Sequence, residues 1–249
     1  MLLEIVCTNI ESVLAAIQGG ADRIELCENL ETGGVTPSFD FIRLAKKASP
    51  IPLHVLIRPR SGDFVYSAEE FSLMRESVLF CKDIGVEGVV LGCLLSNGKI
   101  DTDKTRELVS LAKPMSVTFH RAFDVAANYP EILEDVVSCG CDRLLTSGQA
   151  SNALLGKERI RELILLSKNK LVVMPGGGVR EENVSEIIRF TGSSEIHSSC
   201  LNFGPANKFS SLNNLMVNSN GNSDLAKPIP DQEDIRRLKK IANNSEKGN

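Results

Sequence analysis

Acidic, basic and imidazole side chains follow several short apolar runs in this sequence, and their types are those needed for acid–base chemistry on an anion. Arginine binds a phosphate or a carboxylate through paired N–H groups, and a carboxylate or an imidazole can transfer a proton. Eight residues of this kind are candidate catalytic groups: Glu25, Arg58, Arg60, Asp63, His120, Arg121, Asp124 and His197. We expect the arginines to hold the anion and Glu25 or His120 to move the proton.

A run of three glycines in "MPGGGV" is a candidate anion-binding site. Gly176, Gly177 and Gly178 leave backbone N–H groups bare just before "REENV", which opens a predicted helix. Backbone N–H groups near a helix N-terminus attract anions, and Ser198 in "EIHSS" is placed with them. The alternative is that the three glycines merely form a tight turn.

The sequence repeats a phrase that marks the junction of a helix and a strand. "GGADRIELC", from Gly19, and "GCDRLLTSG", from Gly140, both read Gly–x–Asp–Arg–aliphatic. A glycine in the left-handed conformation commonly ends a helix, and the apolar residues after it are typical of a strand. "GVEGVVLG" and "GSSEIHSS" follow the same order more loosely, so a repeated βα unit is predicted.

Eight apolar runs predict eight strands, at residues 2–7, 23–27, 53–58, 88–94, 116–123, 143–148, 171–178 and 195–200. Eight β–α alternations match a (β/α)8 TIM barrel, an α/β fold, formed as a single domain over residues 1–249. An open doubly wound sheet is the alternative. Such a sheet often carries a Gly-x-Gly-x-x-Gly turn after its first strand, and the turn after Cys7 contains no glycine.

Helical patterns lie between these runs. Five segments show the three- and four-residue spacing of apolar side chains that is typical of helices: 10–17, 71–78, 160–164, 184–188 and 235–241. Two capping boxes predict helix starts, Thr8 with Glu11 and Ser67 with Glu70. The segment 202–231 is rich in Asn and Ser and weakly periodic, so we predict a long mobile loop there.

Alternation along a barrel strand predicts which side chains face the interior. Helices cover the outside of a barrel, so the outward positions must be apolar. In the run 23–27 this places Glu25 and Cys27 inside, because the aliphatic residues alternate with them. The same reasoning places His120 and His197 inside. All four lie toward the C-terminal ends of strands, which is where barrels of this kind carry their active sites.

The composition limits the functional classes. The net charge is −4 and no Lys/Arg cluster occurs, so the electrostatic footprint of a nucleic-acid partner is absent. No apolar run approaches the ~18 residues of a membrane span, and "MLLEIVC" does not read as a secretory signal. Seven cysteines without an export signal indicate a reducing compartment. We therefore expect a protein of the cytoplasm or the nucleus without a membrane partner, and no motif indicates an organic cofactor.

Several motifs resemble those of the CutC copper-homeostasis protein family. They are "ADRIELC", "GGVTPS", "IRPRSGDFVYS", "VTFHRAFD", "LLTSG", "MPGGGV" and "EIHSS", in the family's order across residues 2–200. The resemblance implies a TIM barrel, an intracellular homo-oligomer and a link to copper tolerance. It also implies Cu(I) binding at Cys7 and Cys27, and thiolate sulfur suits Cu(I).

The resemblance leaves the geometry of this thiol pair open. If Glu4 faces the interior, alternation turns Cys7 outward, away from Cys27. The two thiols then meet only if Cys7 has already left the strand, or if Glu4 does not face the interior. Cys200, directly after "HSS", is a further thiol that could compete for the metal. Ser61 stands where the family usually has a second glycine.

Three functions are compatible with these residues. The first is a copper-handling protein that uses the thiols. The second is an enzyme that acts by acid–base chemistry on a small molecule bearing a phosphate or a carboxylate. The third is a barrel that serves only as a binding scaffold, which the fold alone does not exclude. The expected ligand is accordingly a copper ion or a small anionic molecule.

Overall fold

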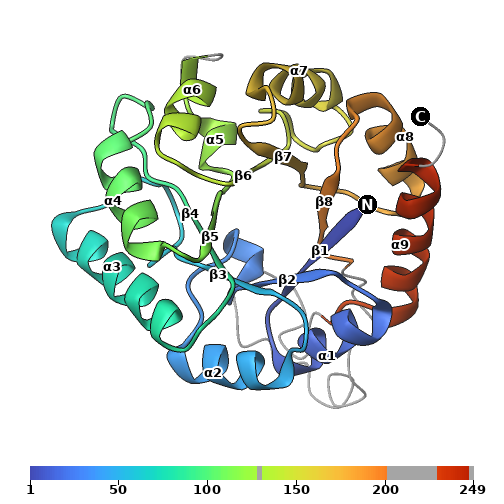
Figure 1. Ribbon diagram of the computed structural model, residues 1–249, viewed down its shortest axis with the longest axis horizontal. Coiled ribbons are helices and arrows are strands. Elements are labelled where there is room, and N and C mark those ends of the chain that lie inside the picture. The colour runs from blue at the N-terminus through green and yellow to red at the C-terminus, as the bar shows by residue number, and fades with distance from the viewer. Residues whose placement is uncertain (128–130, 201–228, 247–249) are drawn as a thin grey trace, which may run out of the picture.

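The computed structural model describes residues 1–127, 131–200 and 229–246 of the chain. Parallel strands form an inner ring and helices surround it (Figure 1). The loop predicted over 202–231 falls outside the described residues, apart from its last three positions.

The strands are β1 (Leu2–Cys7), β2 (Arg23–Leu26), β3 (Leu53–Leu56), β4 (Gly88–Leu91), β5 (Ser116–Phe119), β6 (Arg143–Thr146), β7 (Val172–Pro175) and β8 (Glu195–Ser198). The hydrogen-bonded order is β7-β6-β5-β4-β3-β2-β1-β8, and β7 lies beside β8, which closes the ring (Figure 1). The predicted TIM barrel is confirmed. Most strands are shorter than the predicted runs, because the last residues of each run leave the sheet and begin the βα loops.

The helices are α1 (Ile10–Gly19), α2 (Phe39–Ala48), α3 (Ala68–Asp83), α4 (Thr102–Ala112), α5 (Ala122–Val125), α6 (Glu131–Ser138), α7 (Lys157–Ser167), α8 (Glu181–Thr191) and α9 (Gln232–Glu246), with a short 3-10 turn, η1 (Leu30–Thr32). Helix α9 packs against α1 and α8, so the end of the chain covers the side of the barrel where it begins (Figure 1). The periodic segments predicted α1, α3, α7, α8 and α9, whereas no bounds were predicted for α2, α4, α5 and α6.

Local hydrogen bonds set the helix starts. The capping box predicted at Ser67 and Glu70 is confirmed at the start of α3. The box predicted at Thr8 and Glu11 is wrong, because α1 begins one residue later. The Asn9 side chain accepts the N–H of Ser12 at 2.8 Å, and the Ser12 hydroxyl accepts the N–H of Asn9 at 3.1 Å.

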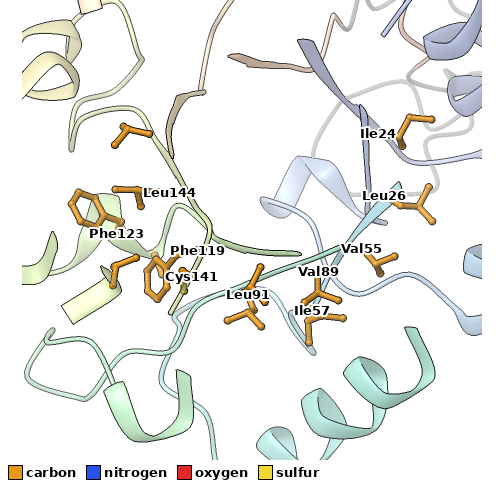
Figure 2. Close-up of a cluster of buried hydrophobic side chains, with 14 of the residues drawn as sticks. Ile24, Leu26, Val55, Ile57, Val89, Leu91, Phe119, Phe123, Cys141 and Leu144 are labelled. Atoms are coloured by element: carbon orange, nitrogen blue, oxygen red, sulfur yellow. The ribbon is translucent and has the colours of Figure 1, made fainter. Parts of the chain in front are cut away.

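Apolar side chains fill the layer between the ring and the helices. Ile24, Leu26, Val55, Val89 and Leu91 alternate along β2, β3 and β4 and are fully buried in this layer (Figure 2). Burying each such side chain contributes on the order of 2 kcal/mol. Because neighbouring positions of a strand point to opposite faces, the residues between them line the interior of the ring.

Gly88 and Gly92, in and directly after β4, leave space inside the barrel for two imidazole side chains. A Cβ atom added at Gly88 would lie 2.5 Å from the ring of His54, and one added at Gly92 would lie 2.7 Å from the ring of His120. The two imidazoles therefore lie directly against the backbone of β4 and the residue after it. Alanine at position 88 would require the His54 imidazole to move, and alanine at position 92 would require the His120 imidazole to move.

Candidate functional site in the barrel interior

Charged side chains fill the deep, N-terminal part of the barrel interior. The Arg23 guanidinium pairs with Glu4 through Nε and donates from Nη2 to Glu195 Oε2 at 2.6 Å. Arg143 Nε also donates to Glu195 Oε2, at 2.8 Å. The four side chains come from β2, β1, β8 and β6. Each charge has an opposite partner, as charges removed from water require.

Glu25 and His197 lie one step nearer the C-terminal ends of β2 and β8. Glu4 Oε1 and His197 Nδ1 are 2.8 Å apart. Burial raises the pKa of the Glu25 carboxyl to about 7, because the attraction of His197 offsets it only in part. Burial disfavours the charged form of His197, but the carboxylates of Glu25 and Glu4 outweigh this and raise its pKa. The Glu25 carboxyl is therefore populated in both protonation states near neutral pH.

Glu4, Glu25 and His197 are also the set of described residues with the spacing of metal ligands, since their ligand atoms all lie within 4.8 Å of one another. Carboxylate and imidazole donors suit a divalent ion better than Cu(I), which prefers sulfur. Both Glu4 oxygens are already engaged, one by Arg23 and one by His197. A metal ion would have to replace these contacts, so the set is better arranged for proton transfer than for metal binding.

His120 directly follows β5, Arg58 lies two residues after the end of β3, and both line the upper part of the interior. Both contact the ring of Phe64: the Arg58 Cζ atom is 4.8 Å from the ring centroid, and the centroid of the His120 ring is 4.9 Å from it. Burial and the Arg58 charge lower the pKa of His120 to about 3. The His120 imidazole is therefore neutral at physiological pH.

The Arg58 guanidinium is held by backbone carbonyls of two loops. Nη1 donates to the carbonyls of Thr32, at 3.2 Å, and Gly34, at 2.8 Å, in the β2–α2 loop. Nη2 donates to the carbonyl of Gly62, at 2.7 Å, in the β3–α3 loop. Arg58 thus joins the two loops, and these three hydrogen bonds fix the guanidinium in place.

Five polar atoms on the interior wall have no hydrogen-bond partner among the described residues: Glu25 Oε2, His54 Nδ1, Arg58 Nε, Thr118 Oγ1 and His120 Nε2. All five side chains are buried. Leaving a buried polar atom unpaired costs about 1–3 kcal/mol, so such atoms gather where a bound molecule or water completes their hydrogen bonds. The barrel interior has the character of a binding site for a polar ligand.

Two of the candidate residues, Arg60 and Asp63, lie at the surface in the β3–α3 loop. Arg60 donates to Glu70 Oε1 at 2.5 Å and to Asp63 Oδ1 at 2.9 Å. Asp63 Oδ1 also accepts the N–H of Val65 at 3.0 Å. The Arg60 hydrogen bond and then that N–H lower the pKa of Asp63. These side chains organise their own loop rather than face the barrel interior.

Asp124 is occupied by donors from within the protein. Its carboxylate accepts the N–H groups of Ser147, at 3.0 Å, and Gln149, at 3.1 Å, and the Thr146 hydroxyl. Arg121 Nε donates to it at 2.7 Å. Asp124 therefore joins α5 to the loop after β6, and few of its lone pairs are left for a ligand.

Arg121 lies against the glycine run. A Cβ atom added at Gly177 would be 3.1 Å from Arg121 Cζ. Gly177 and Gly178 have φ angles of 93° and 74°, a region that favours glycine, whereas the Gly176 N–H is bonded to the Thr146 carbonyl at 2.9 Å. The arrangement places a half-exposed guanidinium next to a glycine turn, and anion binding there stays a prediction.

The thiols of Cys7 and Cys27 face opposite sides of the sheet. The Cys27 N–H donates to the Cys7 carbonyl at 3.0 Å, but Cys7 packs in the outer apolar layer with Cys200, and Cys27 packs inside the ring. Glu4 faces the interior and Cys7 is still part of β1, so neither of the two conditions that would bring the thiols together is met. Ser198, the remaining anion-binding candidate, also faces outward and donates to the Val179 carbonyl at 2.7 Å.

The candidate set from the sequence lacked the residues of the deep ionic network. Glu4, Arg23 and Arg143 occupy inward positions of their strands by the same alternation that places Glu25 inside. A charged residue at an inward strand position was the available signal. Glu4 and Arg23 act electrostatically on both Glu25 and His197 and shift their pKa values.

Comparison with known proteins identifies the family of this barrel. Residues 1–202 match the model of the CutC family. The chain belongs to the CutC family. A CutC family protein from Chromobacterium violaceum is 47% identical to it over 198 residues, which are 80% of each of the two chains.

Solved structures agree with this family. A crystal structure of CutC from Streptococcus agalactiae has a TM-score of 0.76 and 32% identity, and it covers 80% of this CutC family chain and 98% of that one. Phosphoribosylanthranilate isomerase from Thermotoga maritima has a TM-score of 0.60 over 98% of this chain and 99% of that one, but 14% identity. The isomerase therefore shows the shared barrel fold alone. Among the described helices, none combines the length and the apolar character needed to cross a membrane.

Proposed function

We propose that this CutC family member acts in copper homeostasis, and that it binds a small anionic molecule in the barrel interior and moves a proton on it. The copper role follows the relatives: CutC of Streptococcus agalactiae is described as a candidate copper homeostasis protein. One observation supports the interior site. Glu25, Arg58 and His120 each present a buried polar atom that no described residue pairs.

The roles divide according to protonation. Arg58 and the neutral His120 supply N–H donors for the anion. Glu25 exchanges the proton, because a carboxyl with a pKa of about 7 is populated in both forms at physiological pH. His197 is bonded to Glu4, and the nearby Glu25 carboxylate favours the charged form of its imidazole.

A ligand screen tests the interior site. We expect at least one member of a library of organic acids, sugar acids and phosphorylated metabolites to raise the melting temperature of the full-length protein. Solvent deuterium should then exchange into that ligand, and Glu25→Gln should slow the exchange at least a hundredfold while the ligand still binds. A library without a stabilising compound, or exchange unchanged in Glu25→Gln, would remove acid–base function from the interior.

Cu(I) binding by thiols is a second candidate, supported by the adjacency of Cys7 and Cys27 at the ends of neighbouring strands. Both thiols are fully buried, and burial raises the pKa of each. Cu(I) would have to displace these protons. One of the two side chains would also have to turn, past the end of its strand, to the other face of the sheet. Binding should therefore be slow and should strengthen as the pH rises.

Titration of Cu(I) against a competing chelator tests this second candidate. Sub-nanomolar binding is expected in the wild type, lost in both Cys7→Ala and Cys27→Ala. Cys81→Ala is the matched control, because Cys81 is an equally buried thiol in α3. Cys200→Ala examines the neighbouring thiol. Binding that survives both substitutions at Cys7 and Cys27 would rule out this pair as the copper site.

A further inference from the structure

The hydrogen bonds of His120 determine which ring nitrogen carries its proton. Nδ1 lies 3.2 Å from the backbone N–H of Ala122 and accepts it, so Nδ1 carries no hydrogen. The burial that lowers the pKa of His120 keeps the ring neutral, and a neutral imidazole carries one proton. That proton is on Nε2, which is therefore a hydrogen-bond donor. Nε2 is buried and has no acceptor among the described residues.

Arg58 has a comparable unpaired donor. Its two terminal nitrogens are fixed by the carbonyls of the β2–α2 and β3–α3 loops. The remaining N–H, on Nε, is buried and lacks an acceptor in the described part of the chain. The Arg58 and His120 side chains both pack on Phe64, and the Arg58 charge acts on the His120 ring. Two preorganised donors, one neutral and one charged, thus occupy the same region of the barrel mouth.

We propose that His120 Nε2–H and Arg58 Nε–H together bind a carboxylate of a small organic acid. This inference deepens the proposed function and rests on it, because it assigns both the substrate class and the donors. Two fixed N–H groups beside an aromatic ring match a flat, singly charged group. The inner cluster contains the apolar side chains of Val6, Leu56 and Val90. The nonpolar part of the ligand would contact these side chains.

A phosphate fits this place less well. A phosphate presents more oxygens than two N–H groups can bind, and such groups are usually held by several backbone N–H groups at a glycine turn. The turn at Gly177, beside Arg121, has that character. The two anion classes are therefore expected at different places at the mouth.

The protonation of His120 is tested by NMR on protein labelled with 15N-histidine. The chain has three histidines, so the spectrum has three imidazole systems, and His120→Leu identifies one of them. We expect His120 to be neutral with the proton on Nε2 from about pH 5 to about pH 8. A proton on Nδ1, or titration near the ordinary histidine pKa, would overturn the proposal without involving any ligand.

Oxalate is the probe for the carboxylate. We expect oxalate to shift the His120 Nε2 resonance of the full-length wild type and to bind ten- to a hundredfold more weakly to His120→Leu, as for loss of one charge-assisted hydrogen bond. Arg121→Gln should leave oxalate binding unchanged and weaken binding of inorganic phosphate. If His120→Leu does not fold, the His120 signals are assigned from the backbone resonances of the wild type, and the shift of its Nε2 resonance decides.

The outcomes separate the two proposals. Oxalate binding that is lost in Arg121→Gln but kept in His120→Leu places the anion at the glycine turn, which overturns the carboxylate assignment and leaves an anion site at the mouth. A second decisive result is a library ligand that exchanges deuterium in a Glu25-dependent way and binds equally well to His120→Leu and the wild type. That result would likewise overturn the carboxylate assignment and leave the proposed function standing. Oxalate that fails to bind the wild type at millimolar concentration also overturns the assignment.

Discussion

Replacing Arg23 by methionine is expected to lower the free energy of unfolding by about 3–5 kcal/mol. Arg23 is the partner of both Glu4 and Glu195 in the deep interior. Burial would raise the pKa of Glu4, but Arg23 and then His197 outweigh it and keep the pKa below the ordinary value. Methionine fills most of the volume and removes the charge, so two buried carboxylates lose their main counter-ion.

Urea denaturation of Arg23→Met and the wild type at pH 7 measures this loss. Lys46→Met is the matched control, because Lys46 pairs with Glu87 where both are partly exposed, and such pairs contribute less than about 1 kcal/mol. A loss of stability in Arg23→Met no larger than in the control would show that Arg143 and His197 neutralise Glu195 and Glu4 without Arg23.

The second large effect is a pH dependence located at Glu25. The pKa of this carboxyl is raised from its ordinary value to about 7 in the folded protein, so the folded state binds the proton more tightly than the unfolded chain. This contribution to stability is complete below the unfolded pKa and is lost as the pH rises through about 7. The loss amounts to about 3 kcal/mol, since each pKa unit corresponds to about 1.4 kcal/mol.

Glu25→Gln removes this titration while keeping the shape of the side chain. The free energy of unfolding of the variant, minus that of the wild type, should rise by about 3 kcal/mol from about pH 4 to about pH 9. His54 and His120 titrate in the opposite sense, because burial lowers the pKa of each, but their contributions cancel in the difference. A difference that stays flat would show that Glu25 ionises at its ordinary pKa.

Much of the barrel could be predicted from local sequence signals. A helix-ending glycine, a polar pair and an aliphatic run were enough to find repeated βα units, because all three signals lie within a few consecutive residues. Alternation then placed Glu25 and His197 inside and, once Glu4 was known to face inward, Cys7 outside. No periodic segment was identified for α2 or α4, although α2 buries Ile42 on its apolar face and α4 buries Leu108.

The roles of the loop residues could not be predicted in the same way. Arg60 and Asp63 bond to each other within one loop, and Asp124 bonds to the loop after β6. The sequence pattern of a carboxylate after a strand is the same whether the side chain faces the interior or accepts hydrogen bonds from a neighbouring loop. The difference depends on contacts between segments about 25 residues apart, which no local pattern encodes.

The two glycines against which His54 and His120 lie have an evolutionary consequence. Because the imidazoles occupy the space that side chains at positions 88 and 92 would take, the members of each pair cannot change independently. A relative with a methyl group at position 92 would need a smaller group at position 120, and with it would lose a ring nitrogen from the mouth. We therefore expect positions 92 and 120 to covary among relatives, so that a side chain at position 92 accompanies loss of the imidazole at position 120.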